Sequence, residues 1–282
     1  MLKIDAHNHF WRFDPVRDNW ITDDMSVIRK DFLPPDFLPV LQDHGFDGCV
    51  VVQSSQSESE TIFQMANAAK YPFIKAVVGW IDLQTPEVEA LEKRLDMYRT
   101  AGSVKGFRHI LQGEEDRAMM LRPAFKNGIR LLQQYGFTYD ILILPDQLKY
   151  AAELVAAFPG QRFVIDHIAK PDIRTGSIQD WKKDIAAVAA HENVLCKISG
   201  MVTEADWKHW KKEDFIPCID AVVNAFGTNR IMYGSDWPVC TVAASYGEML
   251  GIVQHYFAPF SAAEQAAFFG GNACNFYNID AG

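Results

Sequence analysis

The sequence predicts an α/β fold, namely a single (β/α)8 barrel (TIM barrel), regular or distorted, in which residues 1–282 form one domain. Two observations favour this fold. About eight short apolar runs rich in β-branched residues alternate with helical patterns. Polar residues follow these runs at their C-terminal ends, where barrels of this class carry their active sites. The alternation also allows an open doubly wound sheet, which is the structural alternative.

Most of the expected strands read as continuously apolar, which is typical of parallel strands buried on both faces. Thr85 and Pro86 are expected to begin a helix that ends at Gly102. Ser261 and Glu264 form a capping box for the last helix. The expected strands cover residues 2–6, 48–53, 74–81, 104–110, 138–144, 162–168, 194–199 and 230–234.

Composition excludes several classes of protein. A net charge of −9, without a block rich in Lys or Arg, argues against nucleic-acid binding. No apolar stretch reaches the length needed to span a membrane. The five cysteines are scattered and form no C-x-x-C pair, so a disulfide framework is not expected. Because the first expected strand leaves no room for a signal peptide, we expect a cytoplasmic enzyme, for which a homo-oligomer is compatible.

The first and last expected strands end in residues that suit hydrolytic chemistry. His7 and His9 are two apart, so on a strand their side chains point the same way. Asp236 follows the last strand, between Gly234 and Pro238, which shape a sharp exit. Two imidazoles and a distant carboxylate hold a divalent metal, or position a hydrolytic water without one. This pairing predicts a hydrolase.

Other strand ends supply further candidates. Gln53 is suited equally to capping a loop and to contacting substrate, and Arg108 to binding a polar ligand or pairing with an acid. Asp140 lies in an apolar run, where a carboxylate is costly unless it is paired or used. Because neighbours on a strand point to opposite sides, either Asp166 or His167 is expected in the barrel lumen, and we choose His167.

Four segments, read together, resemble the amidohydrolase superfamily and specifically its amidohydrolase-2 branch. They are DAHNHFW at 5–11, VKGFRH at 104–109, VIDHIAKP at 164–171 and YGSDWP at 233–238. The resemblance spans essentially the whole chain. Within the branch it is greatest to the hydrolases of sugar lactones such as L-fuconolactone or L-rhamnonolactone. It therefore implies a lactonase that acts on a small sugar lactone and forms the aldonic acid.

The resemblance has departures that bear on the metal. Members of the superfamily with two metals use a lysine on the fourth strand and a histidine on the fifth. Here the fourth strand ends in Arg108 and His109, and the fifth offers Asp140. We therefore expect either one divalent ion, zinc first, held by His7, His9 and Asp236, or a metal-free site.

The expected mechanism assigns two catalytic residues. Asp236 would be the general base for the attacking water, and His167 would polarise the lactone carbonyl or take part in proton transfer to the leaving ring oxygen. The remaining candidates would bind substrate, through polar contacts with its hydroxyls or by packing against the apolar face of the sugar. They are Gln53, Arg108, His109, Asp140 and Lys170, and the aromatic residues Trp11 and Trp237.

Two other functions compete with this interpretation. A decarboxylase of the same branch, or a hydrolase of a dicarboxylate lactone, needs several cations for its substrate's carboxylates. Only Arg108 and Lys170 are expected near the rim. A non-catalytic protein that binds a sugar acid would keep the barrel. It would not need a positioned base such as Asp236.

Overall fold

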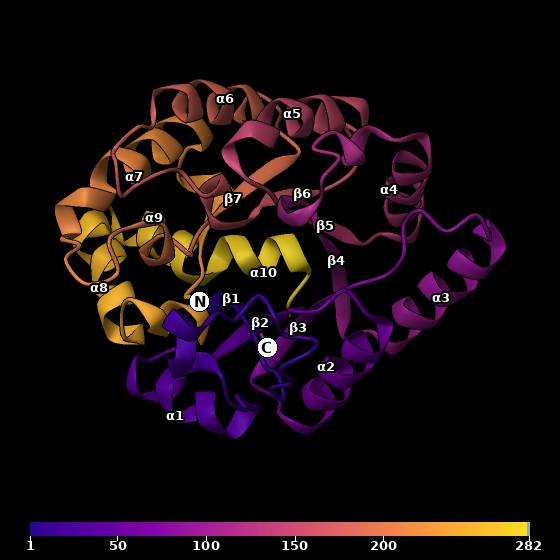
Figure 1. Cartoon of the computed structure of the whole chain (residues 1–282), viewed down its shortest axis with the longest axis horizontal. Helices are drawn as coiled ribbons and strands as arrows, with labels where there is room; N and C mark the ends of the chain where they lie inside the picture. Colours follow the sequence, from indigo (N-terminus) through magenta and orange to yellow (C-terminus); the bar gives the residue numbers. More distant parts are fainter. Residues whose placement is uncertain (281–282) are drawn as a thin grey trace.

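The computed structural model describes residues 1–280 and contains one sheet of eight parallel strands in the order β1 to β8 (Figure 1). Each strand begins within two residues of its predicted start. The strands are β1 (Ile4–Asn8), β2 (Gly48–Val52), β3 (Ile74–Gly79), β4 (Val104–Ile110), β5 (Thr138–Leu142), β6 (Phe163–Ile165), β7 (Val194–Ile198) and β8 (Ile231–Tyr233).

Helices surround the sheet in Figure 1. The predicted capping box of the last helical segment is confirmed, because Ser261 and Glu264 cap α9 in this way. The helix predicted to begin at Thr85 begins instead at Val88. The helices are α1 (Pro34–Asp43), α2 (Glu58–Lys70), α3 (Val88–Ala101), α4 (Pro123–Tyr135), α5 (Leu148–Ala157), α6 (Gln179–Ala189), α7 (Lys212–Phe226), α8 (Tyr246–Phe257), α9 (Ala262–Ala266) and α10 (Asn272–Tyr277).

The seam between the last and first strands closes the sheet into a nearly complete, distorted barrel. At the rim, the backbone N–H of Asp236 donates to the carbonyl of His7 at 2.8 Å, and that of His9 donates to the carbonyl of Trp237 at 2.8 Å. These bonds connect the residues that follow β8 with the end of β1. The predicted barrel is therefore confirmed over the open sheet.

Two apolar clusters fill the structure. The larger lies between the sheet and the outer helices. The smaller lies inside the ring of strands, where residues such as Val50, Val164 and Met232 pack against Phe276 and Tyr277. Phe276 and Tyr277 are the last two residues of α10, the yellow helix in the middle of the ring in Figure 1. One end of the barrel is therefore filled by the C-terminal segment.

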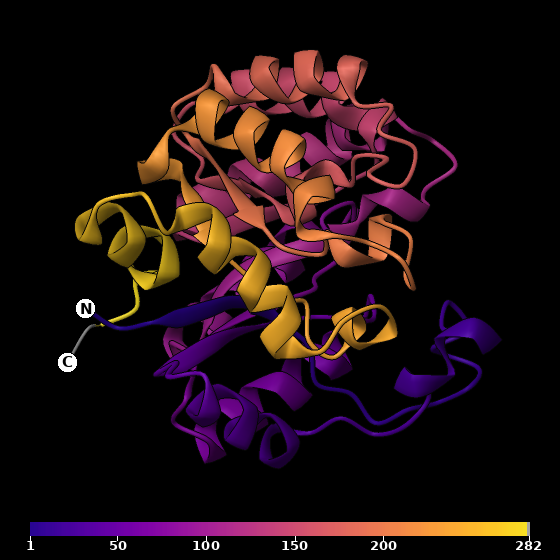
Figure 2. The same ribbon diagram turned by 90° about the vertical axis from the view of Figure 1, so that its left-hand side faces the viewer.

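A close approach of two backbones brings this segment into place. Figure 2 shows the C-terminal helices beside the start of β1. A Cβ atom on Gly270 would lie 1.9 Å from the carbonyl oxygen of Leu2. Only glycine therefore lets the chain cross the first strand at this point.

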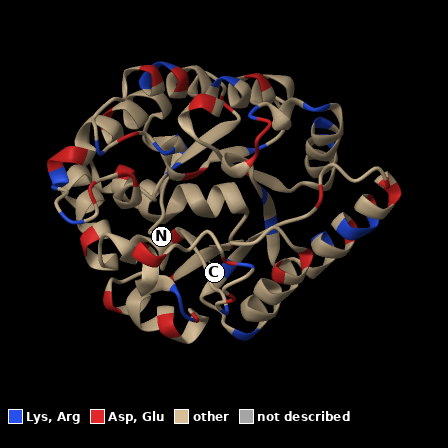
Figure 3. Cartoon of the chain, viewed as in Figure 1, with Lys and Arg blue, Asp and Glu red and all other residues tan. Residues whose placement is uncertain are grey.

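Acidic and basic residues are interspersed over the outer helices (Figure 3). Among residues 1–280, no helix has both the length and the apolar character required to cross a membrane.

Candidate active site

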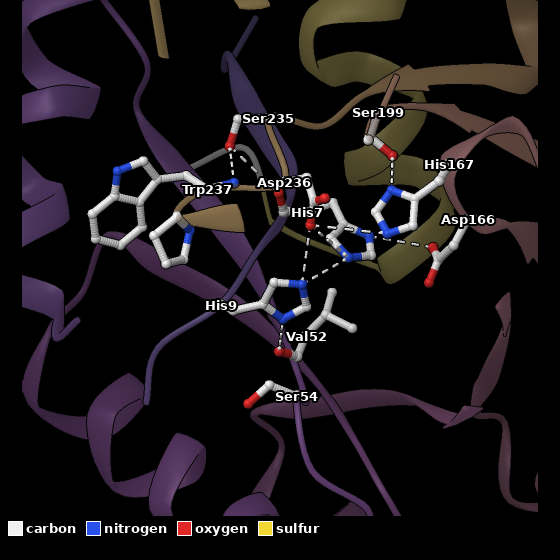
Figure 4. A network of polar contacts seen from close by, with 12 residues as sticks. His7, His9, Val52, Ser54, Asp166, His167, Ser199, Ser235, Asp236 and Trp237 are labelled. Atoms are coloured by element: carbon white, nitrogen blue, oxygen red, sulfur yellow. Dashed lines mark hydrogen bonds and ion pairs between the residues drawn. The ribbon is translucent and has the colours of Figure 1, made fainter. Parts of the chain in front are cut away.

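Two histidines from β1 and the residue after it converge on the rim of the barrel (Figure 4). The Nε2 atoms of His7 and His9 lie 3.3 Å apart. The Nδ1 atom of His9 is 2.7 Å from the carbonyl oxygen of Val52, to which it donates a proton. The tautomer of His9 is therefore fixed, with the lone pair of Nε2 facing the site.

Asp236 joins the two histidines from the other side of the seam. Its Oδ1 atom lies 3.2 Å from Nε2 of His9 and 4.0 Å from Nε2 of His7. Its backbone is left-handed, with φ 59°, and this turn directs the carboxylate into the barrel. The sequence prediction that these three residues meet agrees with their positions.

The end of β6 turns abruptly, and this turn overturns one prediction. Residues 167–170 all have positive φ, so alternation along the strand stops at Ile165. Asp166 and His167 consequently both face the lumen, and the prediction that only one would do so is wrong. His167 bonds Ser199 Oγ through Nδ1 at 2.9 Å, and its Nε2 lies 3.9 Å from Oδ1 of Asp236.

Asp166 is the centre of a fully buried ionic network beneath His7. Its Oδ2 atom accepts a hydrogen bond from Arg108 at 3.0 Å. Its Oδ1 atom lies 3.0 Å from Nζ of Lys197 and 3.3 Å from Nδ1 of His7. Lys197 also donates to Asp140. His7 thus rests on a set of paired charges.

Burial and neighbouring charges set the protonation states. Burial lowers the pKa of His7 and of His167 well below the ordinary value, despite the carboxylates beside them. Burial alone would raise the pKa of Asp236, but the neighbouring His167 and His9 outweigh it and lower that pKa. His7 and His167 are therefore neutral and Asp236 is ionised near neutral pH.

The donor set fits a divalent metal. His7, His9 and Asp236 each offer one ligand atom, and these atoms lie within 4.8 Å of one another. His9 keeps its Nε2 lone pair free, and Asp166 stands at Nδ1 of His7, as carboxylates do behind metal-binding histidines. Two imidazoles and a carboxylate with an open position are a typical catalytic zinc set.

A cavity of about 310 Å³ opens above these residues. His9, Arg108, His167, Lys170 and Asp236 supply its charged and titratable lining. Its remaining lining residues are Trp20, Ser54, Ile110, Gln112, Gly113, Leu142 and Val239.

The other polar candidates divide between the cavity and its surroundings. Arg108 and Lys170 line the cavity, and each is also paired with an acid. Gln53 is buried and donates to the carbonyl of Arg108 at 3.1 Å. His109 bonds Glu114 through Nε2 at 2.8 Å, and neither His109 nor Gln53 is part of the cavity lining.

Asp140 and the two tryptophans also lie outside the lining. Asp140 sits inside the barrel below the cavity, bonded to Lys197. Trp237 stacks on Phe37 with ring centroids 4.5 Å apart, and Trp11 donates to a backbone carbonyl at 2.9 Å. Trp20 is the tryptophan that lines the cavity.

Sequence reasoning missed Lys197 and Ser199, which support Asp166 and His167 from β7 and the residue after it. Lys197 had a usable signal, because it stands in the otherwise apolar run Val194–Ile198. A buried lysine in a strand is costly unless an acid pairs with it. Ser199 had no such signal.

The barrel and its rim of histidines and aspartate define a hydrolase of the amidohydrolase class. The sequence matches the amidohydrolase family over residues 4–279, and the chain belongs to that family.

Two curated relatives and one solved structure resemble the chain over nearly its full length. L-Fucono-1,5-lactonase of Burkholderia multivorans is 36% identical over 99% of this chain and 96% of its own. The enzyme of the same name from Burkholderia ambifaria is 35% identical over the same shares. A crystal structure of an amidohydrolase from B. multivorans with bound zinc has a TM-score of 0.95 and 35% identity, covering 99% of this chain and 100% of the other.

Proposed function

We propose that the chain is a lactonase that hydrolyses a sugar lactone such as L-fucono-1,5-lactone to the aldonic acid. The observation that carries this proposal is the identity of 36% with an L-fucono-1,5-lactonase over 99% of the chain. The site geometry agrees with it, because an ionised carboxylate and neutral imidazoles converge at one cavity. Water adds to the lactone carbonyl, the ring C–O bond breaks, and the acid formed releases a proton at neutral pH.

Asp236 acts as the general base in this proposal. Its lowered pKa keeps it ionised near neutral pH, and its carboxylate lies at the cavity, where it can accept a proton from the attacking water.

His167 stabilises the lactone carbonyl or the departing ring oxygen. Nε2 of His167 faces the acceptor Oδ1 of Asp236 at 3.9 Å, which favours a proton on Nε2. Nδ1 then accepts the hydrogen bond from the hydroxyl of Ser199 at 2.9 Å. A neutral imidazole with this tautomer donates a hydrogen bond to a substrate oxygen. When it passes its proton to the leaving alkoxide, it regains one from Asp236, which took that proton from the attacking water and whose Oδ1 lies 3.9 Å away.

His7, His9 and Asp236 would hold one zinc ion. A metal at this position supplies Lewis acidity, which lowers the pKa of water and polarises the carbonyl. The support comes from the donor set of this chain and from the zinc in the crystal structure of the similar amidohydrolase.

The cavity suits a sugar with one apolar side. Trp20, Leu142 and Val239 present apolar surface, whereas Arg108 and Lys170 present donors for hydroxyls. Both cations are already paired with Asp166 and Glu204, respectively. This pairing leaves little free positive charge for two carboxylates, so a sugar lactone is favoured over a dicarboxylate.

The test is proton release from a panel of lactones. We expect acid from L-fucono- or L-rhamnonolactone, loss of turnover after chelation, and recovery with added zinc. Turnover that survives complete chelation would refute the metal assignment but leave the proposed lactonase activity standing. Protein that is folded and loaded with zinc, yet releases no acid from any sugar lactone, would refute the proposed function.

A further inference from the structure

The interior of the barrel holds a chain of buried polar contacts that the proposed mechanism does not use. Tyr277, at the end of α10, donates its hydroxyl to Oδ2 of Asp140 at 2.8 Å. Asp140 accepts from Lys197, which is fully buried. Lys197 in turn lies 3.0 Å from Oδ1 of Asp166. The contacts run from the C-terminal helix to the floor of the candidate active site.

The upper end of this chain reaches His7. Oδ1 of Asp166 and Nζ of Lys197 both lie 3.3 Å from Nδ1 of His7. On the other side of the ring, Nη1 of Arg108 lies 3.3 Å from Nε2. A guanidinium and an ammonium both only donate hydrogen bonds, so Arg108 favours a lone pair on Nε2, whereas Lys197 favours one on Nδ1. Zinc binding through Nε2, the nitrogen that lies 3.3 Å from Nε2 of His9, requires the lone pair on Nε2. In this zinc-binding form the proton lies on Nδ1, 3.3 Å from Oδ1 of Asp166, a buried carboxylate oxygen that otherwise accepts no hydrogen bond among the described residues.

Stability alone does not account for these charges. Arg108 and Lys197 balance Asp140 and Asp166, but buried ion pairs are often no more stable than apolar side chains of the same volume. The neighbouring interior positions are in fact filled by aliphatic residues. A function served by the charges is the better explanation, and the group directly above them is His7.

We propose that Lys197 is a positioning residue for His7. It holds Asp166 in the place where Asp166 accepts the Nδ1 proton, so that Nε2 of His7 keeps its lone pair toward His9 and Asp236. Asp140 holds Lys197, and Tyr277 holds Asp140. The tautomer of His7, and with it the consequence for activity and zinc binding, rests on the proposed function, whereas the place of Lys197 beside Asp166 and Nδ1 of His7 does not.

The test uses a variant that removes the cation without unbalancing the charges. Lys197→Met combined with Asp140→Asn removes one positive and one negative group and leaves Asp166, Arg108 and His7 in place. A matched control, Lys126→Met with Glu153→Gln, removes an ion pair of 3.4 Å at the surface. Zinc affinity is measured by competition with a chromophoric chelator, and kcat and KM for L-fucono-1,5-lactone at saturating zinc.

We expect the interior double variant to bind zinc about 10- to 100-fold more weakly and to lose kcat by a similar factor. KM should change far less, because substrate contacts remain, and the surface control should match the wild type in every measurement. A folded interior variant with zinc affinity and kcat within twofold of the wild type would overturn the proposal.

Two further measurements keep the proposal testable in every case. If the double variant does not fold, Tyr277→Phe removes a single hydroxyl from the same chain of contacts and should lower zinc affinity several-fold, whereas unchanged affinity would overturn the proposal. If the wild type neither binds zinc nor turns over a lactone, the proposed function fails by itself. The ring ¹⁵N signals of His7 then decide the matter. One fixed tautomer in the wild type that becomes a mixture in the interior variant supports positioning by Lys197, and identical spectra refute it.

Discussion

His9 is fixed through Nδ1 and presents the lone pair of Nε2 to the site, and this explains why a histidine is needed there. Nδ1 donates to the carbonyl of Val52, and Nε2 lies 3.2 Å from Asp236. Glutamine or asparagine cannot present a donor and an aromatic nitrogen acceptor in this geometry. Asp236 lies beside His9 and His167. Both roles proposed for it, general base and zinc ligand, require its negative charge.

Asp236→Asn tests the general base. Asparagine keeps the size of the side chain and one oxygen but cannot accept a proton from water. We expect kcat to fall by about 10²- to 10⁴-fold, with a thermal unfolding midpoint close to that of the wild type. Asp206→Asn, at an exposed carboxylate, is the matched control and should keep full activity. An Asp236→Asn enzyme with near-wild-type kcat would exclude Asp236 as the base.

The residues of the site were predictable to different degrees, for physical reasons. His7, His9 and Asp236 end strands, and the carboxyl ends of barrel strands meet at one rim, so order along the chain was enough to bring them together. Asp166 was misplaced because a left-handed turn interrupts the strand alternation. The contacts of Trp20 depend on how a long loop folds over the rim, which no local pattern specifies.

At the scale of elements, the seam between β8 and β1 carries the active site. Residues after β8 bond the end of β1 through the backbone, so His7, His9 and Asp236 are fixed by the same bonds that close the barrel. Gly234 permits this contact, because a Cβ atom there would lie 2.6 Å from Cβ of His7 and 3.1 Å from Cβ of Ser199. Closure and catalysis therefore depend on the same close approach.

Gly234→Ala should disturb both the closure of the barrel and the active site. The added methyl group must displace His7 or the strand that carries it, at a cost of about 1–3 kcal/mol in the free energy of unfolding. We expect zinc affinity and kcat to fall together, measured after chemical denaturation has established the folded fraction.

The matched control for this variant is Gly251→Ala in α8. There the nearest atom to an added Cβ is the flexible Nζ of Lys212 at 3.5 Å, and alanine should be neutral or stabilise the helix by up to about 1 kcal/mol. Equal stability and activity of the two variants would contradict a tight seam.

Secondary structure was predictable where the pattern is local. The strands stand out because they are short, apolar and bounded by turns, and their starts agree with the structure within two residues. The start of α3 was placed too early, because Thr85 and Pro86 suit a turn as well as a helix N-terminus. The end of β6 was placed three residues late. The cause is the left-handed turn that also led to the misplacement of Asp166, because this turn contains no glycine that would have indicated it.

At the scale of the whole molecule, the two ends of the barrel have different tasks. The rim at the carboxyl ends of the strands carries the cavity and its polar groups. The other end is filled by α10, with Phe276 and Tyr277 among the apolar interior residues. The sequence did not predict this arrangement, because a six-residue helix has too short an apolar pattern to indicate where it docks.

Phe276→Ala tests whether the C-terminal segment is part of the barrel core. Phe276 is 4% exposed and packs in the interior cluster, so its truncation leaves a cavity that the surrounding strands cannot fill. We expect a loss of about 3–5 kcal/mol in the free energy of unfolding, measured in urea. Val88→Ala, at a residue that is 36% exposed, should cost far less.

Because the cluster supports the strands from below while the rim residues keep their own contacts, the folded fraction of Phe276→Ala should retain a KM near that of the wild type. A variant within 1 kcal/mol of the wild type would mean that the segment rests on a barrel that is stable without it, and the contacts from Tyr277 to Asp140 would then be a consequence of the fold rather than part of its support.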